Sequence, residues 1–466
     1  MSIIIPANSA VGGGFEVANS VRMNRGSSDY FRRTNNTAGT SDKIGTYSGW
    51  VKRSTTTLDG MFFEGKDLAA SNYTQIYFQA TGALTIYGSG GGMDLVTTAL
   101  FRDPNAWYHV VVAFDTTQGT STNRVKVYVN GVQQTSFATS TYLGQNATIY
   151  FGINGDQQGI GVREDGALLW NGYMSEICYV DGQALAPTEF GEFDEDSGVW
   201  KPIDVSGLTF GNNGCYLDFQ DASNLGNVVA GNSTDFTENG LTAIDQATDT
   251  CTNNFATLNP LDNFYNASTF SEGNLKLSTT TTPEAYNSST IAVSSGKWYC
   301  EIEYDTTASG SSVIGIVDGP PTAANASLHK QAQGWGYRDG GNVKNNDSTV
   351  SGSWASYTTG DIIGIALDLD NNRLFFSKNG SFQNSGDPTS STGAITITAP
   401  SSLTTGHYFF AIGDYNAGTS TFIANFGNPI ITGTDQTDGN DRGSFEYAVP
   451  SGYLALCTKN LSGELS

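Results

Sequence analysis

Three turn-rich segments in the last third of the chain combine aromatic side chains with amides, carboxylates and an arginine. Sugars stack their apolar faces on Trp or Tyr, while amide, carboxylate and guanidinium groups take their hydroxyls. The candidate ligand-binding residues are therefore Trp335, Tyr337, Arg338, Trp354, Tyr357, Tyr415 and Asn416. A competing interpretation for Trp335 and Tyr337 is that they belong to a strand and pack into a core.

Groups for covalent chemistry are sparse. The three histidines, His109, His329 and His407, are far apart, and no nucleophile elbow, metalloprotease helix or phosphate-binding loop motif is present. The sequence predicts no catalytic residue, and we expect the protein not to be an enzyme.

Composition predicts many short strands joined by turns. The 466 residues are too many for one core, so two domains are expected. Charged residues make up only 14 % of the chain, against roughly a quarter in average proteins, and glycine is abundant at 56 residues. The net charge of −23, with 22 basic residues spread over the chain, argues against a nucleic-acid partner.

The sequence also bears on compartment. No window approaches the roughly 20 apolar residues of a membrane span, so no membrane insertion is expected. Residues 1–6 lack the basic and apolar regions of a signal peptide. The five cysteines form no C-x-x-C pair, which predicts reduced, mostly buried thiols in a protein that folds in a cytoplasm.

Alternating polar and apolar residues predict the strands of a first domain. Residues 107–115 (WYHVVVAFD) and 124–129 (RVKVYV) follow this pattern, and Asn130-Gly131 suits a tight hairpin turn into the next strand. A single helical turn is expected near Pro187. The first domain is assigned to residues 1–220, and the linker to residues 221–255, which show no sustained period.

A second domain, residues 256–466, repeats this pattern. Residues 298–304 (WYCEIEY) alternate, whereas residues 362–367 (IIGIAL) are uniformly apolar, as expected for a strand buried on both faces. The predicted fold class is all-β, with two antiparallel concanavalin A-like jelly-roll sandwiches in tandem.

Family resemblances agree with this architecture. The motifs GKWYCEI, DIIGIALDLD, LFFSKNG, ANFG and PSGYLAL of the last third resemble the SPRY domain, in the form found in marine bacteriophage structural proteins. The order WYHVVVAFD, VKVYVNGV and the earlier segment YSGWVKR resembles laminin-G-like, concanavalin A-like domains across residues 15–220. SPRY domains bind partners through loops, so the resemblance implies recognition rather than catalysis.

The concanavalin A-like resemblance raises two further questions. Related glucanases share an E-x-D-x-x-E or E-x-D-x-x-x-E motif that places two carboxylates about 5 Å apart. Residues 192–198 (EFDEDSG) come nearest, but Ser197 and Gly198 stand where the second Glu would be. Related lectins also hold calcium at loop rims. The available oxygen donors are Asp115, Asp156, Glu164, Asp165, Asp181 and residues 368–372 (DLDNN). DLDNN also fits ordinary turn chemistry, so no metal or cofactor is predicted and calcium stays open as an alternative.

Together these observations predict a phage virion structural protein that recognises a host surface glycan or receptor from a tail fibre or spike. It would be assembled in the bacterial cytoplasm beside other virion proteins. Fibres are usually trimeric, so a homotrimer is one expectation, although no coiled coil is evident. The alternative is a capsid decoration or head-fibre protein, and a polysaccharide hydrolase ranks lowest.

Overall fold

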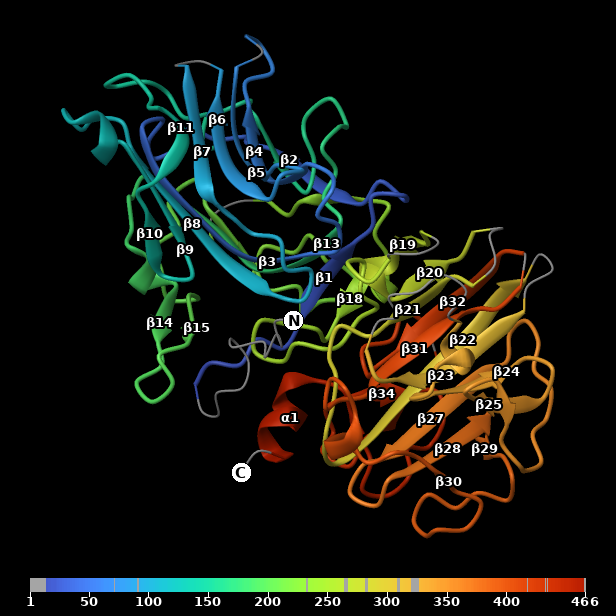
Figure 1. Cartoon of the computed structure of the whole chain (residues 1–466). Coiled ribbons are helices and arrows are strands. Elements are labelled where there is room, and N and C mark those ends of the chain that lie inside the picture. Colours follow the sequence, from blue (N-terminus) through green and yellow to red (C-terminus); the bar gives the residue numbers. More distant parts are fainter. Residues whose placement is uncertain are drawn as a thin grey trace. The chain divides into compact units, whose positions relative to one another are not determined.

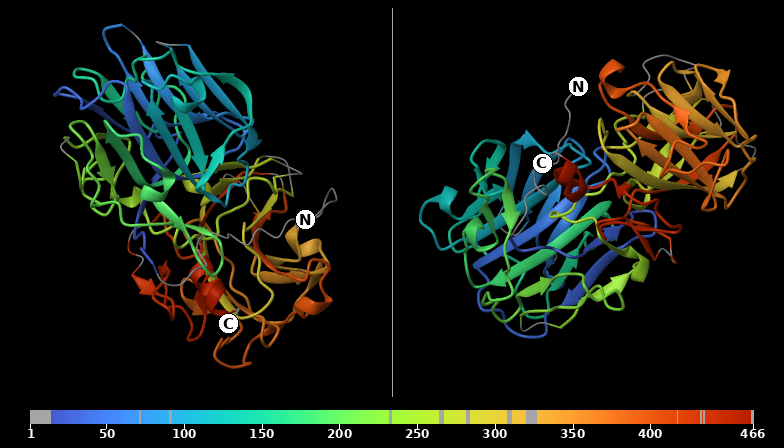
Figure 2. Two further views of the ribbon diagram at one scale, coloured as in Figure 1. Left: turned by 90° about the vertical axis from the view of Figure 1, so that its left-hand side faces the viewer. Right: turned by 90° about the horizontal axis from the view of Figure 1, so that it is seen from below.

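The chain folds into two β units. The computed structural model describes residues 14–464 apart from residues 71, 90–91, 232–233, 264–266, 281–283, 308–310, 320–326, 417, 432 and 434. The first unit contains the described residues up to Asn253, and the second contains those from Asn254 onward. Their strands can be followed from three sides in Figures 1 and 2.

Two eight-stranded sheets form the first unit. Sheet A contains, in spatial order, β10 (Val132–Gln134), β9 (Val125–Val129), β8 (Trp107–Asp115), β3 (Ile44–Arg53), β13 (Gly172–Asp181), β1 (Ser20–Met23) and β18 (Gln246–Ala247), with β16 (Cys215–Leu217) beside β13. Sheet B contains β11 (Phe137–Thr141), β7 (Met93–Leu100), β6 (Ala83–Gly88), β5 (Tyr73–Phe78), β4 (Gly60–Lys66), β12 (Gln157–Ile160), β2 (Tyr30–Thr34) and β17 (Thr237–Asn239). A separate hairpin joins β14 (Gly191–Phe193) to β15 (Trp200–Pro202).

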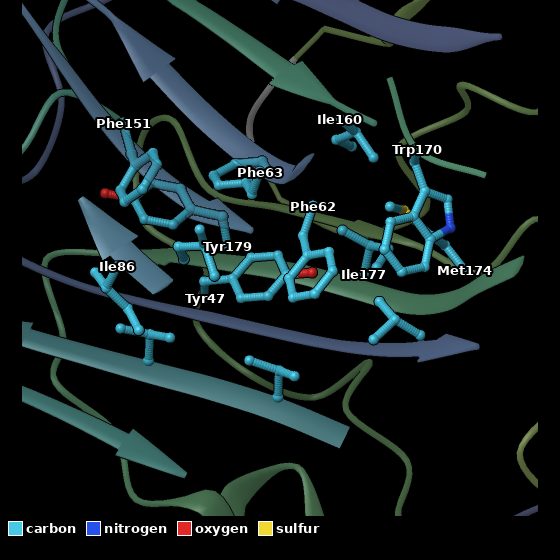
Figure 3. Packing of buried hydrophobic residues seen from close by; sticks show 14 of the residues in the cluster. Tyr47, Phe62, Phe63, Ile86, Phe151, Ile160, Trp170, Met174, Ile177 and Tyr179 are labelled. Atoms are coloured by element: carbon cyan, nitrogen blue, oxygen red, sulfur yellow. The ribbon is translucent and has the colours of Figure 1, made fainter. Parts of the chain in front are cut away.

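The inward-facing side chains of sheets A and B form one aromatic core. Tyr47 and Tyr179 from sheet A pack against Phe63 of sheet B, with ring centroids 5.3 and 5.8 Å from the Phe63 ring. Phe62 meets Trp170 edge to face at 5.0 Å. Figure 3 shows these rings lying between the strands. Phe62 and Phe63 are consecutive residues of β4, and both reach the core because the register shifts between Met61 and Phe63.

The second unit stacks a nine-stranded sheet on a six-stranded sheet. The nine-stranded sheet contains β19 (Thr269–Ser271), β20 (Lys276–Ser278), β32 (Ser420–Asn425), β22 (Lys297–Thr307), β27 (Ile362–Asp368), β28 (Arg373–Lys378) and β29 (Ser381–Phe382), with β30 (Ile395–Thr396) beside β28 and β35 (Leu454–Ala455) beside β22. The six-stranded sheet contains β21 (Tyr286–Ser288), β31 (Phe409–Asp414), β23 (Ser312–Val317), β24 (Gly334–Arg338), β25 (Asn342–Asn345) and β26 (Ser348–Thr349). A short hairpin pairs β33 (Gln436–Thr437) with β34 (Ser444–Phe445).

The all-β prediction is confirmed. The predicted strand over residues 107–115 is β8, and Asn130 and Gly131 both take positive φ, 49° and 75°, in the tight turn from β9 to β10. The predicted turn at Pro187 is a 3₁₀ turn, η2 (Pro187–Glu189). Among the described residues there is one α-helix, α1 (Thr458–Glu464), which the sequence analysis did not predict.

Part of the segment assigned as a linker belongs to the first unit. β17 pairs with β2, and β18 pairs with β1. Asp249 forms an ion pair with Lys52 at 2.7 Å and accepts a hydrogen bond from the Trp107 indole at 3.0 Å. The Lys52 and Asp249 side chains are 1 % and 0 % exposed. The boundary between the two units in the sequence falls between residues 253 and 254, near the end of the assigned linker.

Candidate ligand-binding sites

A row of tyrosines covers the outer face of sheet B. In β5, Ile76 and Phe78 belong to the core cluster, so the alternate residues Tyr73, Gln75 and Tyr77 lie on the opposite face of the strand, where Gln75 is itself only 4 % exposed. In β6, Tyr87 lies opposite Gln75 in the ladder. The rings of Tyr73 and Tyr87 stack with centroids 5.9 Å apart and planes inclined by 25°. All three tyrosines are half-buried. We call Tyr73, Tyr77, Tyr87, Glu64 and Gln75 the tyrosine face.

Polar groups complete this face. Glu64 of β4 lies opposite Gln75, whose amide donates a 2.6 Å hydrogen bond to its carboxylate. Burial raises the pKa of Glu64 to about 7. Lys66, two residues along β4, lies 3.7 Å from the Glu164 carboxylate and 5.4 Å from the Tyr73 ring centroid. Glu64 and Gln75 are only 2 % and 4 % exposed and bond to each other, so the half-buried tyrosine rings above them are the groups that a sugar could contact.

Sequence reasoning missed the tyrosine face, although a signal exists. The sequence of β5, YTQIYF, alternates Tyr, Gln and Tyr with Thr, Ile and Phe. In a strand with one buried face, an aromatic residue at a position where a polar residue would normally alternate points to the outer face. Two such residues in one strand therefore expose an unusually large aromatic surface.

Two carboxylates occupy facing positions just beyond the paired residues of β4 and β12 in sheet B. Gln157 lies opposite Lys66 in the β12–β4 ladder, so Asp156 and Asp67 are the next facing positions. Asp156 is only 5 % exposed, and its buried Oδ2 atom has no hydrogen-bond partner among the described residues. Burial, and then the Asp67 charge, raise the pKa of Asp156 to about 7.

An orphaned carboxylate beside a second carboxylate is a chemical fit to a hard cation, which prefers oxygen ligands. Asp156 would hold a calcium ion there together with Asp67, whose Oδ1 already accepts the backbone N–H groups of Ala69 and Ala70. No group of three or more His, Cys, Asp or Glu that could hold a metal is found in the described part of the chain. Backbone or amide oxygens would therefore have to complete the site.

The other acids considered for calcium have protein partners. Asp115 accepts hydrogen bonds from Thr117 and Gln118, and Asp165 pairs with Arg163 at 2.7 Å. Asp181 accepts backbone N–H groups of Thr40, Ser41 and Asn213. In the DLDNN turn, Asp368 accepts hydrogen bonds from the Asn371 backbone and amide, the turn chemistry expected of such a sequence.

Three of the aromatic residues proposed as ligand contacts are core residues. Trp335, Tyr337 and Tyr357 are buried, with exposed fractions of 5 % or less. Tyr337 donates a hydrogen bond to the Ala355 carbonyl, and Tyr357 donates one to Ser312 or to the Tyr337 carbonyl. The cause is the alternation of β24, which turns Trp335 and Tyr337 inward and leaves Gly334 and Gly336 outside.

The remaining four do not form one site. Trp354 is half-buried and packs against Tyr337 and Phe376, on the core side of the six-stranded sheet. Arg338 lies on the opposite face, where its guanidinium stacks on Tyr415 at 3.7 Å from the ring centroid. Asn416 follows Tyr415 and is exposed.

The acids of the glucanase-like segment, residues 192–198, form contacts within the β14–β15 hairpin. Glu192 and Asp194 both pair with Lys201 of β15, at 3.3 and 3.2 Å, and Asp194 also accepts the Ser197 backbone N–H. These acids therefore stabilise the β14–β15 turn.

One serine–histidine contact has the wrong polarity for catalysis. The Ser48 hydroxyl lies 2.8 Å from Nε2 of His109, and the Trp200 indole N–H donates to Nδ1 at 2.9 Å. An indole N–H can only donate, so Nδ1 is the acceptor and Nε2 carries the proton. That proton points at Ser48, and His109 cannot act as its base. Burial also lowers the pKa of His109 to about 3.

The five cysteines lie away from these surfaces. All are buried, and burial raises the pKa values of Cys178, Cys215, Cys251 and Cys300. In the described part of the chain, no helix has the length and apolarity that crossing a membrane requires.

The geometry defines a class of protein, a tandem of two antiparallel β-sandwiches. Residues 25–189 match the concanavalin A-like lectin/glucanases superfamily, and residues 297–394 match the SPRY domain. These matches confirm the concanavalin A-like and SPRY domains inferred from sequence. Domains of these two kinds are typically non-catalytic binding domains. No curated protein sequence matches the chain.

Solved structures show distant likenesses. The SPRY domain of human HERC1 is 15 % identical, with a TM-score of 0.29, and the match covers 36 % of this chain and 96 % of that one. A heptameric SAP-like pentraxin from Limulus polyphemus is 17 % identical, with a TM-score of 0.28, covering 37 % and 80 %. A Bacteroides ovatus protein described as carbohydrate-binding is 15 % identical, with a TM-score of 0.27, covering 37 % and 46 %.

Proposed function

We propose that this chain is a non-catalytic recognition protein of a bacteriophage particle, and that it binds a host surface glycan through the tyrosine face of its first unit. The observation that carries the glycan part is the Tyr73–Tyr87 stack on the outer face of sheet B, beside the Glu64–Gln75 hydrogen bond. Half-buried rings on a sheet are held rigidly, so little conformational entropy is lost when a sugar packs on them.

The virion part of the proposal is supported by the resemblance of the SPRY motifs to those of phage structural proteins. We propose that the protein is assembled in the host cytoplasm and contacts other virion proteins. On the particle it would form a trimer at a tail fibre or spike. A capsid decoration or head-fibre protein is the alternative location. Immunogold electron microscopy of the particle tests the two directly, because label on the head excludes the tail proposal.

The glycan proposal is tested by adsorption of the isolated protein to host cells and to their extracted polysaccharide. Tyr73→Ala and Tyr87→Ala should each weaken binding by about 1–2 kcal/mol, or about five- to thirtyfold in Kd. Phe193→Ala is the matched control, because Phe193 is 50 % exposed on the separate β14–β15 hairpin. Equal binding by all three variants would exclude the tyrosine face.

Glu64 gives the hydrolase alternative a specific residue. A carboxyl group with a pKa of about 7 on a tyrosine-lined face has the property of a general acid. The Glu64 side chain is 2 % exposed and already bonded to Gln75, which leaves little access to a glycosidic oxygen. Reducing-end assays on the same polysaccharides should stay at background. Turnover that Glu64→Gln abolishes would replace the binding proposal with the enzymatic one.

A further inference from the structure

Basic and amide side chains gather on the outer face of the six-stranded sheet in the second unit. In the β24–β25 ladder, Arg338 lies opposite Asn342, and Gly336 lies opposite Lys344. The core side chains Tyr337 and Val343 alternate with them, so Arg338, Asn342 and Lys344 share the outer face. The absence of a side chain at Gly336 leaves room for His329, which packs over it from η5 (Leu328–Lys330).

Arg338 is held in place by an aromatic ring. Its guanidinium lies 3.7 Å from the centroid of the Tyr415 ring, a close cation–π contact. Tyr415 is fixed in turn, because its hydroxyl donates a 2.7 Å hydrogen bond to Asp339 and the His329 ring packs edge to face on it at 5.4 Å. The arginine is therefore oriented before any ligand arrives.

The charge of Arg338 is not neutralised by a neighbour. No carboxylate oxygen of the described residues lies within ion-pair distance of its guanidinium, whereas Lys344 pairs with Asp347 and Lys330 pairs with Glu284. The adjacent Asp339 accepts hydrogen bonds from the Tyr415 hydroxyl and the Gly340 N–H on one oxygen, Oδ1. Nε of Arg338 and the side-chain oxygen of Asn342 are buried and have no hydrogen-bond partner among the described residues, so a ligand would contact the two terminal guanidinium nitrogens. Other arginines without an ion pair, such as Arg32, Arg53 and Arg124, donate instead to backbone carbonyl oxygens.

We infer that Arg338, stacked on Tyr415 and flanked by Asn342, binds the carboxylate of an acidic polysaccharide. This inference rests on the proposed glycan recognition and names the ligand class of a second site. A guanidinium presents a planar fork that matches a carboxylate with two parallel hydrogen bonds. The amides of Asn342 and Asn416 suit sugar hydroxyls. Among the described residues that form this patch, Arg338, Asn342, Lys344, Tyr415 and Asn416, there is no aliphatic side chain to serve as the apolar anchor that an acidic protein partner would need.

The test measures binding of the full chain to three immobilised polymers: alginate, which is a polyuronate, neutral pullulan and poly-glutamate. We expect binding to alginate alone, weakened by added salt. Arg338→Ala should raise the Kd about tenfold or more, and Arg338→Lys should give an intermediate value because it keeps the charge but loses the fork. Arg442→Ala is the matched control, since Arg442 is an exposed arginine of the same unit. Melting temperatures of all variants should stay within a few degrees of the parent protein.

Three outcomes would overturn the inference. They are no binding to alginate, equal loss in the Arg338 and Arg442 variants, and equal binding to poly-glutamate, which would indicate an acidic polypeptide ligand. Host-cell adsorption that depends on Tyr73 but not on Arg338 would leave the proposed function standing while the second site fails. Host-cell adsorption that depends on neither Tyr73 nor Arg338 would exclude both the proposed function and the second site.

Discussion

Replacing Asp249 by asparagine should severely destabilise the first unit. The substitution preserves the shape of the side chain and an oxygen for the Trp107 indole, but it removes the charge that faces Lys52 at 2.7 Å. Because both side chains are almost completely buried, Lys52 then keeps its charge without the carboxylate that pairs with it, or must lose its proton, inside the fold. Breaking a buried pair in this way costs about 3–5 kcal/mol.

Calorimetry measures this loss as a shift of the first-unit melting transition. At about 2–4 °C per kcal/mol for a unit of this size, the transition should fall by about 6–20 °C. Burial lowers the pKa of Lys52. The deficit in Asp249→Asn should therefore shrink as pH rises, because a neutral Lys52 is easier to bury than a charged one.

Two variants make the experiment decisive. Lys52→Met combined with Asp249→Asn should lose less stability than Asp249→Asn alone, because no buried charge is left unpaired. Asp165→Asn is the control, since the Arg163–Asp165 pair is exposed and worth less than about 1 kcal/mol. A loss in Asp249→Asn as small as that of the control would show that residues 242–251 are a loosely attached linker and refute the reasoning.

Three further predictions concern titratable groups. Burial raises the pKa of Glu176 to about 8, so its stabilising protonated form is fully present below about pH 4.5 and lost as pH rises through about 8. In urea unfolding from pH 5 to pH 9, the free energy of unfolding should therefore fall by up to about 1.4 kcal/mol per pH unit. The fall should be smaller in Glu176→Gln. Thiol titration of the denatured, unreduced protein should find close to five thiols per chain, whereas two mapped disulfides would contradict a cytoplasmic origin. Calcium at pH 8 should raise the first-unit melting temperature by a few degrees in the parent protein and not in Asp156→Asn. An equal rise in both would exclude the Asp67–Asp156 site.

The sequence predicts strands best where burial follows a simple period. Residues 107–115 and 362–367 are strands because their apolar residues fill one or both faces of a sheet, and that pattern is local. Residues 242–251 have no such period. They attach to sheet A through β18 and the Lys52–Asp249 pair, whose members are 197 positions apart in the chain. No local pattern indicates a contact of that kind.

The positions of the candidate binding residues also depend on contacts that no local sequence pattern indicates. Trp335 and Tyr337 stand among glycines that suggest a loop, yet the glycines belong to strand β24 and leave the outer face open to His329. Of the two interpretations that the sequence allowed for these aromatics, the burial of Trp335 and Tyr337 supports packing into the core. Arg338 and Tyr415 lie 77 positions apart, and only the β23–β24 and β23–β31 pairings bring them together.

The pairing of β1 with β18 has a consequence for synthesis of the protein. Strand β1 ends at Met23, and its partner β18 begins at Gln246, so the first unit closes only after almost its whole length has left the ribosome. At about 5–20 residues per second, translation of this stretch takes roughly 12–50 s. Through that interval the edge of β1 is unpaired and the apolar surface beneath residues 242–251 is open. We expect chaperone dependence during production, and truncation before residue 246 should give aggregated rather than merely shortened protein.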